Sequence, residues 1–503
     1  MNMGDLATAT APEIGLTVVA LAVLLVDVTF LRAWPTARRA TWLGYLTALG
    51  LAGVLLVISQ QLAAPTTHFA DPARIFIVNR LSLTLQGLLV VLTVGTVLIS
   101  MSYEFTQHVG EYFCVTVFAC VGMCFLVATE NLLMFLVALE LLSVCLYILT
   151  AFHKGLLRSA EAALKYFLFG ALSSAFLLFG LSYVVGVTGA VHVNEIAAAV
   201  HAQLAQSSTP PLLLVVGLLF TIVGIGFKIA VVPFHLWAPD AYEGAPTPVG
   251  AFIATGSKVA SFVVGAKILL LGFPELKGSA LWLHWQPGWA LILAVIATAS
   301  MVWGNVAAIA QTNVKRLLAY SSVAHAGYIL IGIIASTSMG TASVLFYLVA
   351  YSLTNLGAFG VVAALTRAAG GDDLEDFDGM AQRAPGMSLL LLVFVLSLAG
   401  IPPLAGFFAK LYVFAAAVGA DQPGYGLLWL VVVAVGTSAV SLYYYLLLLK
   451  HVYVHAPKRA GAVAVPLYLR VTLTLVAVAV VLLGVLPQTL LQTFIDLVAA
   501  DFG

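Results

Sequence analysis

Fourteen apolar runs, each long enough to cross about 30 Å of hydrocarbon, dominate this sequence. With 62% hydrophobic and only 8% charged residues among 503, the chain differs sharply from soluble proteins, in which about a quarter of residues are charged. Backbone polar groups inside a bilayer must be satisfied within the chain, so such runs form helices. The sequence therefore predicts an all-α polytopic membrane protein with about 14 transmembrane helices. The runs lie at approximately 13–32, 41–62, 80–101, 112–129, 131–152, 160–187, 212–238, 246–272, 289–310, 317–336, 341–367, 386–418, 426–454 and 467–490.

The segments between these runs divide their cations unequally. One side collects Arg32, Arg38, Arg39, Lys154, Arg158, Lys315, Arg316, Arg367, Arg383, Lys450, Lys458, Arg459 and Arg470, and the other only Arg74, Arg80 and Lys277. Cytoplasmic loops carry the excess of Lys and Arg. We therefore expect a multi-pass protein of a bacterial inner membrane with both termini on the periplasmic side. The 21 basic residues balance the 21 acidic ones, so no global charge points to nucleic acid.

A faint internal repeat is visible. A shift of about 180 residues lays the sixth and seventh runs on the eleventh and twelfth, and a shift of 182 lays Lys228 on Lys410. Each copy then holds five helices, and an odd number inverts the second copy, as in many transporters. We expect an N-terminal three-helix segment at 1–110, five-helix repeats at 111–280 and 281–456, and a C-terminal helix at 457–503. The stretch 191–209 is too polar to span and predicts a short surface helix.

The seventh and twelfth runs carry helix-breaking signals. The seventh reads GIGFKIAVVPFHLWAP and the twelfth SLAGIPPLAGFFAK. Proline removes a backbone donor, and unpaired backbone at membrane depth survives only where protein or water covers it. We predict that both helices are discontinuous and that Lys228 and Lys410 lie beside the breaks.

Five lysines, Lys165, Lys228, Lys258, Lys267 and Lys410, lie inside these runs. A cation at the bilayer centre costs roughly 2.5–3.5 kcal/mol, so five in one chain require a compensating role. Lysine in general becomes able to exchange protons near neutral pH when it is desolvated, and a nearby carboxylate opposes that change. Movement of protons through the membrane is the role that these residues favour.

Glu140 supplies such a carboxylate in the fifth run, and Lys165 lies early in the next, where adjacent antiparallel helices could bring the two together. A static pair retained for packing is the alternative. For Lys258 the alternative is a bond to backbone carbonyls, and for His325 a neutral packing role. Lys267 lies nearer the outer helix end, where a long side chain can extend to the interface.

Two polar segments stay open in their interpretation. His235, Asp240 and Glu243, at the cytoplasmic mouth of the seventh run, either pass protons or solvate a loop. The acidic run 372–378 is most simply a solvated loop.

The four cysteines form no C-x-x-C pair, and no dinucleotide or haem motif is present in the sequence, so we expect no metal site and no redox cofactor in this chain.

Four motifs resemble the antiporter-like membrane subunits of respiratory complex I, the proton-translocating NADH:quinone oxidoreductase. They are GFKIAVVPFHLWAPDAYEGAP (226–246), ATGSKVASF (254–262), KRLLAYSSVAHAGY (315–328) and LAGIPPLAGFFAKLYVF (398–414). The resemblance covers essentially the whole chain. It favours the paralogue that has lysine at position 410 and lacks a long carboxy-terminal extension.

The resemblance implies fourteen helices, two inverted five-helix repeats and a proton path through buried charged residues. By motif, that path consists of Glu140, Lys165, Lys228, Lys258, His325 and Lys410. It also implies other membrane subunits and lipid as partners, with NADH, FMN, iron-sulfur clusters and quinone held by partner subunits. Position 345, opposite Lys165 in the second repeat, is Leu345, so the two half-paths are not strictly symmetric.

The sequence thus predicts a redox-free, proton-translocating subunit of an NADH:quinone oxidoreductase. Two alternatives remain open. A subunit of a cation/proton antiporter, or of a membrane-bound hydrogenase-type complex, would use the same residues. An antiporter, however, should carry a cation site rich in oxygen ligands, whereas lysines repel Na⁺. A purely structural membrane scaffold would tolerate loss of Lys228.

Overall fold

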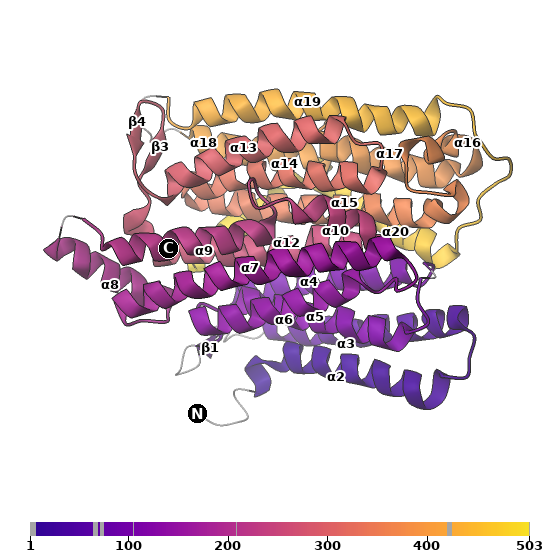
Figure 1. Ribbon diagram of the computed structural model, residues 1–503, viewed down its shortest axis with the longest axis horizontal. Helices are drawn as coiled ribbons and strands as arrows, with labels where there is room; N and C mark the ends of the chain where they lie inside the picture. Colours follow the sequence, from indigo (N-terminus) through magenta and orange to yellow (C-terminus); the bar gives the residue numbers. More distant parts are fainter. Residues whose placement is uncertain are drawn as a thin grey trace.

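The computed structural model describes residues 7–63, 69–70, 75–103, 105–207, 209–419 and 425–501. Arg74, which entered the charge comparison above, lies outside them. The α-helices are α2 (Ala11–Val26), α3 (Thr36–Ala63), α4 (Arg80–Ser100), α5 (Val109–Ala128), α6 (Leu132–Thr150), α7 (Leu157–Thr188), α8 (Val193–Gln206), α9 (Leu212–Ile229), α10 (Trp237–Gly244), α11 (Thr247–Phe252), α12 (Lys258–Lys267), α13 (Trp289–Ile309), α14 (Val314–Ala335), α15 (Ser338–Ala369), α16 (Met380–Arg383), α17 (Pro385–Ala399), α18 (Ala405–Val418), α19 (Leu428–Tyr453), α20 (Leu467–Val485) and α21 (Pro487–Asp501). Figure 1 shows the long helices side by side, along the long axis of the molecule.

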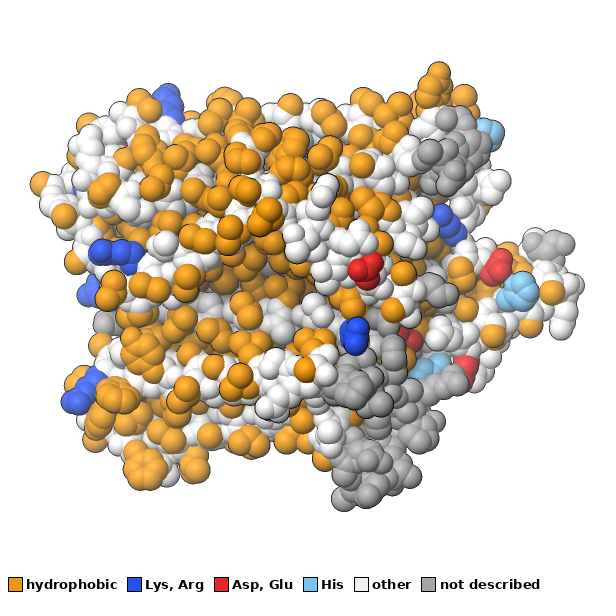
Figure 2. Space-filling view, turned by 180° about the vertical axis from the view of Figure 1, so that it is seen from behind, with side chains coloured by type: hydrophobic (Ala, Val, Ile, Leu, Met, Phe, Trp, Pro, Cys, Tyr) orange, Lys and Arg blue, Asp and Glu red, His pale blue; other side chains and the backbone are white. Residues whose placement is uncertain are grey.

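Thirteen helices within the described residues are long and apolar enough to cross a membrane. They include Thr247–Gly272, in which α11 and α12 continue through the π-helical turns Ile253–Ser257 and Ile268–Gly272. The predicted twelfth span consists of α17 and α18, each too short to cross alone. In series they supply the fourteenth crossing, so the predicted all-α polytopic fold is confirmed. Figure 2 shows a broad hydrophobic belt, with Lys and Arg gathered toward the left edge and others on the right half of this face.

The burial of the helices is graded from the centre outwards. All residues in the most apolar window of Thr247–Gly272 are buried, as are 94% in α14 and 83% in α15. The corresponding share is only 22% for Ala11–Leu31 and 28% for α20, which face outwards. Lysines on the central helices are therefore shielded from lipid by protein.

The two predicted helix breaks have the same backbone geometry. Helix α9 is followed by Ala230, which is left-handed (φ 57°), and Val231 N–H donates to Gly226 O at 3.1 Å. Helix α17 is followed by Gly400, also left-handed (φ 85°), and Ile401 N–H donates to Leu396 O at 3.0 Å. Both ends have the 6→1 hydrogen bond of a Schellman motif. The discontinuous seventh and twelfth helices are therefore confirmed.

The two broken helices also approach their breaks from opposite ends of the molecule. In Figure 1, α9 arrives from the end where α8 lies, and α17 from the end where α16 lies. This is the arrangement expected of inverted repeats. Lys228 precedes its break whereas Lys410 follows its own, so one shift of the sequence cannot align both the lysines and the breaks.

The connecting segments hold the remaining elements. Helix α8 is the predicted short helix, and it protrudes beyond the bundle in Figure 1. Two antiparallel hairpins join strands β1 (Phe69–Ala70) with β2 (Ile77–Val78) and β3 (Ser279–Leu281) with β4 (His284–Gln286). The proposed boundary between the repeats, at 280/281, falls within the second hairpin. The domain boundaries themselves stay predictions.

The expectation of a solvated loop at 372–378 holds only in part. Asp373 and Glu375 are exposed, but Leu374 and Phe377 are buried, and Asp378 is only 8% exposed. The segment folds back because its two apolar side chains enter the core, and Asp372 and Asp378 pair with Lys315 of α14 and His451 of α19.

The paired breaks give a test of the fold. A left-handed residue with a Cβ costs roughly 1–2 kcal/mol, which glycine avoids. We expect Gly400→Ala to lower the free energy of unfolding by about that amount and Ala230→Gly to raise it, as measured by thermal unfolding of the detergent-solubilised chain. In Gly400→Ala the new methyl group would also meet the Lys410 side chain at 3.1 Å. Equal stability of the two variants would contradict the assignment.

Candidate functional site

Lys228 lies in the last turn of α9, directly before the first break. It is 7% exposed, and its Nζ donates to the Ser143 hydroxyl of α6 at 2.5 Å. The rings of Tyr147 and Phe227 flank the ammonium group at 5.5 and 5.3 Å. The carboxyl-terminal end of a helix favours a cation through its partial negative charge. The position of Lys228 is thus favourable although a hydroxyl, rather than a carboxylate, contacts it.

Glu140 lies one turn before Ser143 on the same helix. Its Oε1 accepts a hydrogen bond from Ser174 of α7 at 2.6 Å, and its charge is near enough to act on Lys228. The predicted contact between Glu140 and Lys165 is not formed in this structure. Ser174 is nine residues beyond Lys165, and at 1.5 Å per residue this places Lys165 about 13 Å farther along α7.

Lys165 instead joins a charged network where α7, α10 and α14 meet. Its Nζ lies 2.8 Å from both Asp240 and Glu161, and its side chain is 42% exposed. Arg316 bonds Asp240 at 2.6 Å and Glu243 at 2.9 Å, and Arg158 also pairs with Glu243. The two carboxylates of α10 are therefore held by three cations.

Lys258 begins α12 immediately after a π-helical turn and is only 1% exposed. Its Nζ donates to the backbone carbonyl of Ser322 in α14 at 2.6 Å, and the Tyr351 ring lies 5.7 Å away. The carbonyl bond is the arrangement considered above as the alternative to a proton-transfer role. This bond uses one of the three N–H donors of the ammonium group, so it is compatible both with a static role and with proton transfer.

His325 lies one turn after Ser322 on α14 and is buried. Its Nδ1 is 2.7 Å from the Tyr347 hydroxyl, and its Nε2 is 3.3 Å from the Tyr445 hydroxyl. The charges of Lys258 and Lys410 both act on this imidazole. Both ring nitrogens therefore have a hydroxyl partner that can donate or accept.

Lys410 lies on α18, just after the second break, and is 6% exposed. Its Nζ donates to the carbonyls of Leu398 and Ala399 at 3.1 and 3.0 Å and to the Ser438 hydroxyl at 2.8 Å. The two carbonyls end α17, where the break leaves them without helical partners. The ammonium group thus satisfies backbone that the break exposes.

A set of polar side chains that the sequence did not single out lies around Lys258, His325 and Lys410. Tyr242 lies 3.4 Å from the Ser322 hydroxyl, and Tyr445 bonds Ser321. Asn305 bonds both Tyr328, at 3.0 Å, and Tyr444, at 2.9 Å, and the Tyr328 ring lies 5.4 Å from Lys410. The signal was available only as tyrosines in two apolar runs, 317–336 and 426–454, and in the segment between the seventh and eighth runs, without any common spacing.

Lys267 differs from its expected position. It does not extend to the interface: its side chain is 3% exposed, and its Nζ lies 3.0 Å from Val127 O and 3.7 Å from Glu130. Glu130 lies in the loop that begins at Thr129, and its carboxylate points into the protein beside this lysine. Nothing in the sequence indicated that Glu130 is the partner of Lys267.

His235, which the sequence grouped with Asp240 and Glu243, lies apart from their network. Neither of its ring nitrogens makes a hydrogen bond among the described residues, although the side chain is 4% exposed. It packs edge-on toward the Tyr320 ring, with centroids 6.5 Å apart. Of the three residues, the two carboxylates form the network.

The Asp240 network predicts a pH-dependent contribution to stability. Burial alone would raise the pKa of Asp240, but hydrogen bonds from Lys165 and Arg316 outweigh it and lower the pKa below its usual value. A lowered pKa stabilises the folded state above the unfolded-state pKa of about 3.9, and the contribution is lost as the pH falls through the folded-state value. We expect Asp240→Asn to lower the free energy of unfolding by about 1.5–3 kcal/mol at pH 7.

Thermal unfolding of both proteins between pH 7 and pH 3 checks this prediction, because the difference should shrink toward the acid end. Glu161→Gln, which removes a 60% exposed partner of Lys165, is the control and should cost far less. A difference that grows as the pH falls would contradict the assignment.

Comparisons with known proteins agree with this geometry. Residues 129–441 match the family described as "NADH:quinone oxidoreductase/Mrp antiporter, TM". The chain is 47% identical to "NADH-quinone oxidoreductase subunit N 2" of Acidobacterium capsulatum over 90% of this chain and 91% of the relative. It is 33% identical, with a TM-score of 0.76, to a chain of "Respiratory complex I from Thermus thermophilus with bound Aureothin", covering 96% of this chain and 98% of that one.

A more distant structure shares the fold alone. A chain of the Mrp complex from a Dietzia species superposes with a TM-score of 0.79 at 20% identity, covering 97% of both chains. The architecture is thus common to assemblies with different names, and function has to be argued from the buried residues.

Proposed function

This chain belongs to the NADH:quinone oxidoreductase/Mrp antiporter membrane family, among relatives named NADH-quinone oxidoreductase subunit N, and from that premise we propose that it moves protons across the membrane within such a complex. Quinone reduction in partner subunits would drive the movement, and this chain would hold no redox group. Other subunits of the complex are its partners. The excess of cations on one side supports periplasmic termini in a bacterial inner membrane.

One observation carries the proposal. Lys228, Lys258 and Lys410 are buried, and among the described residues each is held by hydroxyl or carbonyl oxygens rather than by a contacting carboxylate. An ammonium group without a counter-ion pays a desolvation cost that release of its proton removes. Hydroxyl groups and the His325 imidazole lie between Lys258 and Lys410 and can both accept and donate protons. These groups can therefore pass a proton, with water bridging the remaining gaps.

Glu140 is suited to control this transfer. At about 6 Å and an effective dielectric constant near 20, a carboxylate attracts an ammonium group by roughly 3 kcal/mol. Moving one charge against 100 mV costs about 2.3 kcal/mol. A change in the distance between Glu140 and Lys228 is thus of the right size to gate one proton. Lys165, in its network with Asp240, would connect this site to the cytoplasmic surface.

The test separates proton transfer from a fixed charge. Arginine keeps the cation but does not release its proton in proteins. We expect both Lys228→Ala and Lys228→Arg to reduce proton transfer through the chain by at least about 100-fold, the usual scale for a positioned acid–base group. The measurement is proton translocation per NADH oxidised in membrane vesicles, with assembly of the complex checked on native gels.

Lys154→Ala removes an exposed lysine and serves as the control. Full translocation by an assembled Lys228→Arg complex would show that a fixed positive charge suffices and would overturn the proposal.

The family description also names Mrp antiporters, which keeps cation exchange as a second candidate. Na⁺ binding needs several oxygen ligands, whereas the central positions of this chain are lysines. Na⁺ flux measured in the same vesicles decides between the two, because proton movement without Na⁺ counter-flow is expected here. Na⁺ flux that depends on Lys228 would favour exchange instead.

A further inference from the structure

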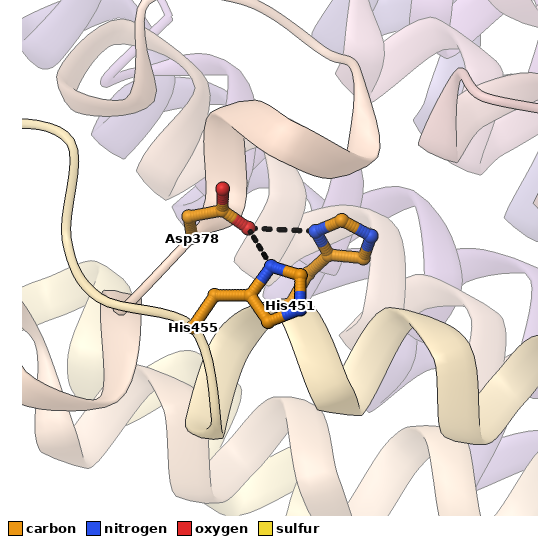
Figure 3. A group of neighbouring side chains, drawn as sticks. All are labelled: Asp378, His451 and His455. Atoms are coloured by element: carbon orange, nitrogen blue, oxygen red, sulfur yellow. Dashed lines mark hydrogen bonds and ion pairs between the residues drawn. The ribbon is translucent and has the colours of Figure 1, made fainter.

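A cluster of three ligand-type side chains lies outside the proton-transfer residues, where α19 ends (Figure 3). His451 is in the last turn of α19, His455 follows two residues after the helix, and Asp378 comes from the segment between α15 and α16. Their side chains are 13%, 35% and 10% exposed. The cluster is therefore partly covered by protein but open to solutes through His455.

Both imidazoles are directed at one carboxylate oxygen. His451 Nδ1 lies 2.6 Å and His455 Nδ1 lies 3.1 Å from Asp378 Oδ1, and the three ligand atoms all lie within 4.8 Å of one another. The rings pack with centroids 4.5 Å apart. Figure 3 shows the two nitrogens converging on this oxygen from the same side.

Backbone contacts fix this convergence. Gly379 N–H, next to Asp378, donates to His451 O at 3.0 Å, and His455 N–H donates to Lys450 O at 3.3 Å. Gly379 is left-handed (φ 66°), and a Cβ there would lie 2.3 Å from Pro457 N. The acidic segment and the end of α19 are thus docked closely by backbone contacts.

We propose that Asp378, His451 and His455 form a binding site for a divalent transition-metal ion of the Zn²⁺ class. Two imidazole nitrogens and one carboxylate oxygen are a ligand set that Zn²⁺ uses, with water completing a tetrahedron. His451, in the last turn of α19, and His455, two residues beyond it, both direct Nδ1 at Asp378, so the two rings can bind one ion. Zn–N bonds of about 2.0–2.1 Å separate tetrahedral ligands by about 3.3 Å, so a slight opening of the cluster admits the ion.

Lys458 carries a positive charge that opposes metal binding at this site. Its Nζ lies 3.8 Å from Asp378 Oδ2 and 2.9 Å from Glu375 Oε2. An arriving divalent ion would repel this ammonium group, which already has Glu375 as an alternative partner. Zn²⁺ binding should therefore shift Lys458 fully toward Glu375, and loss of Lys458 should tighten binding.

The ion would tie α19 to the segment that follows α15. Helix α19 carries Ser438, which bonds Lys410, and α15 carries Tyr347, which bonds His325. Metal binding would thus join two helices that contact the proton-transfer residues. The binding site itself does not depend on proton conduction, and each can be tested without the other.

The experiment titrates Zn²⁺ into the full-length chain, purified in detergent without a polyhistidine tag, in competition with a chromophoric chelator. We expect one site in the native chain. Loss of an outer-shell partner already weakens metal binding by about 10- to 100-fold. His451→Gln and His455→Gln, which remove a ligand, should therefore weaken it by at least about 100-fold. Lys458→Gln should strengthen it by about tenfold, because a repelling charge is removed.

His201→Gln is the matched control, because His201 pairs with Glu275 at 2.9 Å as a single imidazole and should leave binding unchanged. Zinc-edge X-ray absorption should show two imidazoles with bonds of about 2.0–2.1 Å. If His451→Gln fails to fold, His455→Gln still provides the test, because His455 is the most exposed of the three ligands. Equal affinity of native chain and His455→Gln, or weaker binding by Lys458→Gln, would overturn the proposal.

Discussion

The structure depends on how ammonium groups are accommodated far from water. A lysine in hydrocarbon costs several kcal/mol, and this chain lowers that cost by enclosing its central lysines in protein. Helices α12, α14 and α15 are almost wholly buried by the others, and Lys258 and His325 lie on them. The outer helices, which expose most of their surface, separate this polar interior from lipid. The large number of crossings allows several helices, and not just one, to be surrounded by others.

At the second helix break, the free carbonyls and the buried lysine satisfy each other's hydrogen bonds. A break in a membrane leaves carbonyls without partners, and a buried lysine needs acceptors. Lys410 reaches back from α18 to the last carbonyls of α17, so the break supplies what the lysine lacks. Lys228 lies instead in the last turn before its break and uses a serine of the neighbouring helix. The two halves therefore reach the same result by different local contacts, which explains why the internal repeat is faint in the sequence.

Membrane crossings and helix breaks were predictable, because the residues within one segment determine them. Contacts between side chains of different segments were not, because they depend on how the segments are aligned with each other. Run length identified the crossings, and Gly400 with its two following prolines identified a break. The pairing of Glu140 failed because an offset of nine residues along α7, invisible in the sequence, puts Ser174 rather than Lys165 opposite it. The partner of Lys267 and the approach of Asp378 to His451, 73 residues away, depend on how loops fold back. Hydrophobic patterns specify which face is buried, but not which polar atoms meet there.

The choice of neutral partners for the central lysines has an energetic reason. A carboxylate in contact at about 4 Å would attract an ammonium group by roughly 4 kcal/mol at an effective dielectric constant near 20. That exceeds the 2.3 kcal/mol or so that 100 mV provides for one charge, so a central ion pair would hold its proton against the driving force. Serine hydroxyls and carbonyls bind less strongly and leave the proton movable. Asp240 contacts Lys165 at a position where the lysine is partly exposed and water can replace the carboxylate. Under the proposed function, strong pairs where the lysine is partly exposed and weak bonds in the interior would let the chain collect protons and still release them.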